Sequence, residues 1–148
     1  LMTLVQKQTF RYFWDYGHPV SGLARERSNG SDDIVSIGGS GFGVMAIIVG
    51  AERGFVTREQ AAERMLKIVR FLSDKGTDSY HGIWAHWMDG QTGKAVPFSR
   101  KDDGADLVES AFMFEGLLAA HQYFDKDTPV ERNIRGIING LWRQAEWN

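Results

Sequence analysis

The chain has 148 residues, a net charge of −2, 12% aromatic residues and no cysteine. This length is enough for one domain with a sizeable core. The sequence has no basic stripe, so nucleic acid is not expected as a partner, and the absence of cysteine excludes disulfides and thiol chemistry. The longest apolar run, Val44 to Val49, is too short to cross a membrane, and no membrane partner is expected. No signal peptide is visible, but the chain opens directly in a helical pattern, which leaves a missing leader open.

The first half of the chain reads as three helices separated by one long loop. Apolar residues recur at helical spacing over 2–16, and Gly17-His18-Pro19 ends that pattern. The polar stretch 17–39 is longer than an idle loop usually is. Residues 41–53 form an apolar helix that ends at Gly54. Thr57 to Gln60 is a capping box, and it opens an amphipathic helix over 58–74.

The second half adds an irregular stretch and two further helices. Residues 76–101 are rich in aromatics and carry a turn signal at Asp89-Gly90, which predicts a loop or a short hairpin. A strongly apolar helix is predicted over 104–124. Thr128 or Asp127 caps the last helix, which has Pro129 in its first position and covers 130–147.

Apolar helices therefore alternate with amphipathic ones. A helix that is apolar nearly all round is buried on most sides, so 41–53 and 104–124 should be inner helices. The helices 58–74 and 130–147 should be outer ones. This alternation predicts an all-α toroid of helical hairpins, with the long loops gathered at the end where the inner helices begin.

Four carboxylates lie at that end, within eight residues: Asp102, Asp103, Asp106 and Glu109. Asp102, Asp106 and Glu109 have the spacing i, i+4, i+7, which places them within about 60° of each other on one helical face. Like charges at this spacing repel one another, so the cluster costs stability unless it has a function. The structural alternative is a helix cap at Asp102 or Asp103 that complements the helix dipole. That alternative explains Glu109 poorly, and acid–base chemistry is the favoured interpretation.

Candidate binding residues lie near these acids. Trp84, His86 and Trp87 occupy the preceding loop, and exposed indole rings can stack on sugar rings, although either tryptophan alone could equally be a core residue. Arg25 could pair with Glu26 or with the acid cluster, or could contact a substrate. Phe42 and Asp103 complete the predicted substrate-binding set.

Two other interpretations are weaker. The segment Gly41 to Ala46 fits G-x-G-x-x-A, but a dinucleotide-binding fold needs a strand after the helix, and a second helix follows instead. The glycines more plausibly allow a close approach to a neighbour or leave room for a ligand. His81 and His86 could join the acids around a metal, but they show no metal-binding spacing. No cofactor and no metal are therefore expected.

Several motifs resemble the glucoamylase-like family of bacterial proteins, which includes endo-β-1,2-glucanases of glycoside hydrolase family 144. The matching stretches occur in order at residues 10–15, 22–27, 38–43, 86–93 and 101–110. The resemblance implies an (α/α)6 toroid that hydrolyses β-1,2-glucan with inversion, and implies that acids matching Asp102, Asp106 and Glu109 are essential. One relative performs glycosyl transfer within cyclic β-1,2-glucan synthases, so transfer stays open as an alternative.

Family members are much longer than this chain, so residues 1–148 are expected to be the N-terminal portion of a single (α/α)6 domain, in a periplasmic or secreted protein. Glycoside hydrolysis needs carboxyl groups on both sides of the bond, and Asp106 and Glu109 approach from one side. We therefore expect a partner acid in the remainder of the domain, and no activity from these residues alone. A helical domain that binds carbohydrate without catalysis is the other alternative.

Overall fold

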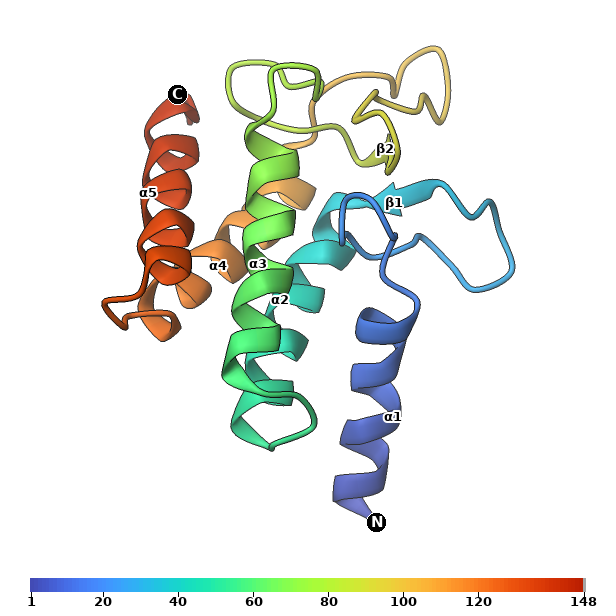
Figure 1. Cartoon of the computed structure of the whole chain (residues 1–148). Helices are drawn as coiled ribbons and strands as arrows, with labels where there is room; N and C mark the ends of the chain where they lie inside the picture. The colour runs from blue at the N-terminus through green and yellow to red at the C-terminus, as the bar shows by residue number, and fades with distance from the viewer. Residues whose placement is uncertain (148) are drawn as a thin grey trace.

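The computed structural model describes residues 1–147, and over this range the chain is built on five helices and one small antiparallel ribbon (Figure 1). The elements in chain order are α1 (Met2–Asp15), β1 (Ile34–Ser36), α2 (Ile37–Glu52), α3 (Arg58–Ser73), β2 (Trp87–Asp89), α4 (Leu107–Tyr123) and α5 (Pro129–Gln144). The all-α prediction is confirmed. No helix among these residues is both long and apolar enough to cross a membrane.

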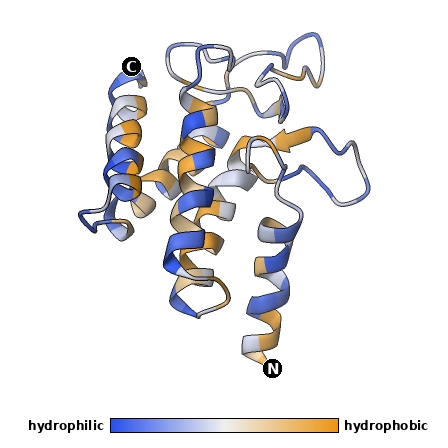
Figure 2. Ribbon diagram, in the orientation of Figure 1, coloured by the Kyte–Doolittle hydropathy of each residue, from blue (hydrophilic) through white to orange (hydrophobic). Residues whose placement is uncertain are grey.

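The predicted alternation of inner and outer helices is also confirmed, and the chain forms part of a helical toroid. The inner helices α2 and α4 pack against each other more extensively than any other pair, while α3 packs on α5 and on α2. The outer helices α3 and α5 display hydrophilic and hydrophobic residues side by side in Figure 2. Their apolar faces cover the inner pair, so the core lies between the two layers.

Glycine sets how closely the inner helices approach. A Cβ atom on Gly41 would lie 2.3 Å from the Phe112 carbonyl oxygen, and one on Gly116 would lie 2.6 Å from the Gly41 oxygen. The backbones therefore touch where the helices cross, and a side chain would force them apart. The interpretation of the glycine motif as a close-packing feature is confirmed, although Gly41 lies inside the helix and not in a loop.

The ribbon joins two segments far apart in the sequence. β1 pairs with β2 in antiparallel register, with Ile34 opposite Asp89, Val35 opposite Met88 and Ser36 opposite Trp87. The expected local hairpin at 76–101 is therefore replaced by pairing with the strand that enters α2. This ribbon lies at the end of the molecule where α2 begins, so it brings the 86–87 region to the inner-helix ends (Figure 1).

Candidate functional site

Asp106 is the residue that starts α4. Its Oδ1 accepts hydrogen bonds from the backbone N–H groups of Val108, at 2.9 Å, and Glu109, at 3.0 Å. Its own N–H donates to the Trp84 carbonyl oxygen at 2.8 Å. The N-cap geometry therefore comes from a side chain that satisfies two orphan donors and a backbone fixed to the preceding loop. The other carboxylate oxygen, Oδ2, is left to face the ribbon.

Glu109 connects α4 to the beginning of α2. Its Oε2 accepts from the Gly38 N–H at 2.8 Å and from the Ser36 hydroxyl at 3.3 Å. Gly38 lies in the first turn of α2, so the carboxylate stabilises a helix N-terminus that belongs to the neighbouring helix. A Cβ atom on Gly38 would lie 2.4 Å from Oε2, which explains why glycine occupies this position.

His86 lies between the two acids. Its Nδ1 is 3.5 Å from Asp106 Oδ2, and its Nε2 is 3.7 Å from Glu109 Oε1. These distances are longer than ordinary hydrogen bonds, so the imidazole is held loosely between two negative charges. The side chains of His86, Asp106 and Glu109 are 32%, 28% and 18% exposed, so a ligand can reach all three.

We call these three residues the acid–histidine cluster. Sequence reasoning identified its members but missed Ser36 and Gly38, which hold Glu109 in place. Ser36 is the N-cap of α2, and its hydroxyl accepts from the Gly39 N–H at 3.2 Å. A serine before two glycines was the available signal, but the helix was expected to start only at residue 41.

The prediction that Asp102 shares the face of Asp106 and Glu109 is wrong. Because Asp106 caps the helix, α4 begins at Leu107, and Asp102 lies in a turn in which its N–H donates to the Ser99 carbonyl oxygen at 3.1 Å. Capping at Asp102 or Asp103 is wrong for the same reason. Asp103 instead lines a separate hollow of about 230 Å³ beside Tyr80 and Ile83.

The prediction of Trp84 as an exposed sugar platform is also wrong. Its side chain is buried, and its ring lies 5.0 Å from that of Phe114 in the core. Trp87 is half-buried and flanked by two other rings, with centroid distances of 3.8 Å to His86 and 4.7 Å to Phe98. Trp87 therefore adjoins the acid–histidine cluster, and Trp84 only supports it from beneath.

The two remaining candidates lie apart from the acids. Arg25 makes neither predicted ion pair: its Nε donates to the Asp32 carbonyl oxygen at 2.8 Å, and its Nη1 donates to the Tyr16 carbonyl oxygen at 3.2 Å. Arg27 pairs with Glu26 instead. Phe42 is 57% exposed on the first turns of α2, so its ring can contact a ligand.

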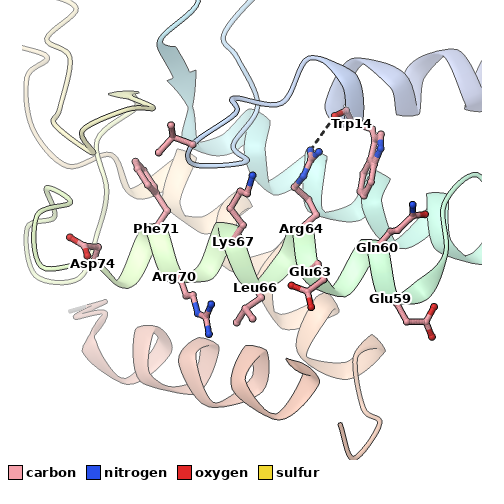
Figure 3. A pocket seen from close by; sticks show the side chains of 11 residues that line it. Trp14, Glu59, Gln60, Glu63, Arg64, Leu66, Lys67, Arg70, Phe71 and Asp74 are labelled. Atoms are coloured by element: carbon pink, nitrogen blue, oxygen red, sulfur yellow. Dashed lines mark hydrogen bonds between the residues drawn. The ribbon is translucent and has the colours of Figure 1, made fainter. Parts of the chain in front are cut away.

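The largest cavity is not at this site. An open groove of about 870 Å³ runs along α3, lined by Trp14, Arg64 and Phe71 among others, and includes no member of the acid–histidine cluster (Figure 3). The Arg64 guanidinium lies 4.3 Å from the Trp14 ring centroid and donates to the Trp14 carbonyl oxygen, which is a structural contact between α1 and α3. Burial lowers the pKa of Arg64.

The cluster can act on a ligand in two ways. Each carboxylate has one oxygen committed to helix N–H groups, which fixes its orientation, and a second oxygen free to accept a proton or a hydroxyl hydrogen bond. Within residues 1–147, no group of three or more histidine and carboxylate side chains is arranged to hold a metal. The arrangement is therefore that of a preorganised pair of carboxylates on one wall of a site.

Comparison with known proteins assigns relatives to this arrangement. No family model matches the chain. It is 49% identical, over its whole length, to an exo-β-1,2-glucooligosaccharide sophorohydrolase (non-reducing end) from Parabacteroides distasonis, and covers 20% of that protein. It matches the structure of an endo-β-1,2-glucanase from Chitinophaga pinensis, in complex with sophorotriose and glucose, with a TM-score of 0.91 and 47% identity, over 98% of this chain and 36% of that one.

A third match is closer in sequence. A candidate glucoamylase from Bacteroides uniformis has 83% identity and a TM-score of 0.98, and the match covers 99% of this chain and 36% of that one. The chain thus spans between a fifth and about a third of the length of these relatives. The resemblance stated from the motifs is confirmed: the chain is a homologue of β-1,2-glucan hydrolases and glucoamylase-like proteins and corresponds to part of each.

Proposed function

We propose that the complete protein containing this chain hydrolyses β-1,2-glucan, and that Asp106 and Glu109 supply one wall of its active site. The observation that carries this proposal is the acid–histidine cluster at the N-termini of two inner helices. Two homologues are named as hydrolases of β-1,2-linked glucans. The carboxylates are exposed enough to meet a sugar and are oriented before it arrives, which is what charge stabilisation and proton transfer require.

The second catalytic carboxyl group is proposed to lie in the remainder of the domain. Asp106 and Glu109 are only three residues apart on one helix end, so they approach a glycosidic bond from the same side. An inverting enzyme needs its two carboxyl groups about 6.5–9.5 Å apart across the bond, with a water between them. Inversion and endo-action are the finer parts of the proposal. A periplasmic or secreted location stays a prediction.

The test uses the complete protein and linear β-1,2-glucan as the substrate. Asp106→Asn and Glu109→Gln should each reduce kcat by about 10²–10⁴-fold, because the amide keeps the volume and removes the proton-transfer group. Glu115→Gln is the matched control, since Glu115 is an exposed carboxylate two turns further along α4. Reducing-end release over time measures the rate, and the sizes of the products distinguish endo- from exo-cleavage.

Three results would contradict parts of this proposal. Full activity in both cluster variants would show that these acids only cap helices. Binding of β-1,2-glucan without hydrolysis by the unaltered protein would favour the carbohydrate-binding alternative. Transfer of glucosyl units to acceptor sugars in place of hydrolysis would identify the protein as a transglycosylase.

A further inference from the structure

The acid–histidine cluster is continuous with a row of aromatic rings. Trp87 is flanked by His86, which faces the acids, and by Phe98. Phe98 is 71% exposed, which is unusual for a phenylalanine in a polar loop. The three rings therefore lead from Asp106 and Glu109 outward to a free aromatic face.

A small hollow opens beside that face. It has a volume of about 220 Å³ and is lined by Glu26, Arg27, Ile34, Trp87, Val96, Pro97 and Phe98. This is below the size of sites for drug-sized ligands and suits one small unit of a chain. Aromatic walls with a few polar groups are the usual composition of a binding site.

The polar groups of the hollow are a charged pair. Arg27 and Glu26 hydrogen-bond to each other, and Arg27 holds the pKa of the Glu26 carboxyl below its usual value. A guanidinium offers several N–H donors and a carboxylate offers acceptor oxygens. Sugar hydroxyls both donate and accept, so this pair can bond to a neutral sugar without leaving a charge unpaired.

We infer that this hollow is a distal subsite for a glucosyl residue of the same glucan chain, with Phe98 as its stacking platform and Arg27 and Glu26 as its hydrogen-bonding groups. The inference rests on the proposed function, because it names a further contact of that substrate. Its occupant is fixed by continuity: Trp87 belongs both to the hollow and to the ring row that ends at His86. A chain held at Phe98 would be directed toward the acids.

The test compares Phe98→Ala with the unaltered complete protein on β-1,2-gluco-oligosaccharides of increasing length. The loss should fall in KM, reach about 5- to 20-fold for the longest substrates and shrink as the chain becomes too short to reach Phe98. Arg27→Gln should give a smaller loss with the same length dependence. Tyr80→Ala is the matched control, because Tyr80 is equally exposed, at 69%, and lies outside the hollow.

Each outcome decides the matter. An equal change for all substrate lengths, or no change, would overturn the subsite while leaving the proposed hydrolysis intact. A fall in Tm without a length-dependent change in KM would show that Phe98 only packs against the remainder of the domain. If the unaltered protein neither hydrolyses nor binds these oligosaccharides, as followed by tryptophan fluorescence, both the subsite and the proposed function fail.

Discussion

Asp106 and Glu109 each divide their two oxygens between a helix end and the site. Asp106 Oδ1 caps α4 and Glu109 Oε2 caps α2, while Oδ2 and Oε1 face His86. The structural and catalytic interpretations of these acids are therefore not alternatives. A carboxylate that must also start a helix cannot rotate away, and this rigidity is what a preorganised site needs.

This double duty gives a prediction for Asp106. Asparagine is nearly as good an N-cap as aspartate, whereas alanine cannot accept the two N–H groups, so Asp106→Ala should cost about 1 kcal/mol of stability and Asp106→Asn much less. Thermal unfolding of the complete protein, beside its activity, separates the two roles. The sequence argument expected removal of either charge to raise the melting temperature by relieving repulsion. With His86 between the acids and N–H groups on both, we no longer expect that gain, and a higher Tm for Asp106→Asn would restore it.

Local signals account for most of what the sequence predicted at the scale of elements. The capping box at Thr57 placed α3 within one residue of its observed end, and Thr128 with Pro129 did the same for the start of α5. The errors lie where a tertiary contact decides. α2 starts four residues early because Glu109, from another helix, satisfies the Gly38 N–H, and the pairing of β1 with β2 joins strands about fifty residues apart. No short window of sequence contains either contact.

The crossing of α2 and α4 predicts how substitutions of glycine differ. Gly116→Ala should destabilise the protein by about 1–3 kcal/mol, because the added methyl group meets backbone that cannot move independently. Gly140→Ala on α5 should stabilise by about 0.5–1 kcal/mol, since nothing lies within 4 Å of its Cβ position and alanine favours the helix. Chemical denaturation measures both. Equal effects of the two changes would mean that the inner helices can separate without cost.

An ion pair between the outer helices predicts a pH dependence. Arg58 Nε lies 2.9 Å from Oε1 of the buried Glu131, and this hydrogen bonding lowers the pKa of Glu131 from its ordinary value of 4.5. A lowered pKa in the folded state contributes stability above pH 4.5, and that contribution is lost as the pH falls through the folded value. The unaltered protein should therefore lose stability on acidification more steeply than Glu131→Gln, which should itself be less stable by about 2 kcal/mol at neutral pH. Parallel Tm curves against pH would contradict this.

The inner helices expose an apolar face, and this is the dominant feature of the whole chain. Its members are Phe42, Met45, Val49, Leu107, Val108, Phe112 and Leu118. Soluble proteins rarely expose a continuous apolar patch of this kind without a partner. The relatives are about three to five times longer than the chain, and we propose that the remainder of the same domain covers this face and completes the toroid.

The isolated 148-residue chain should consequently self-associate and should not hydrolyse β-1,2-glucan. Association follows from the apolar face, so Phe42→Ser combined with Phe112→Ser should shift the chain toward monomer in sedimentation experiments, because the Phe42 and Phe112 rings lie together there, 5.3 Å apart. The lack of activity has a separate cause. The acids occupy one wall of the site, so a bound glycosidic bond would meet a proton donor or a base but not both. Hydrolysis by the purified chain would show that both catalytic groups lie within these residues, and would move the search for the second acid to side chains near His86, of which Glu26 is the first to change.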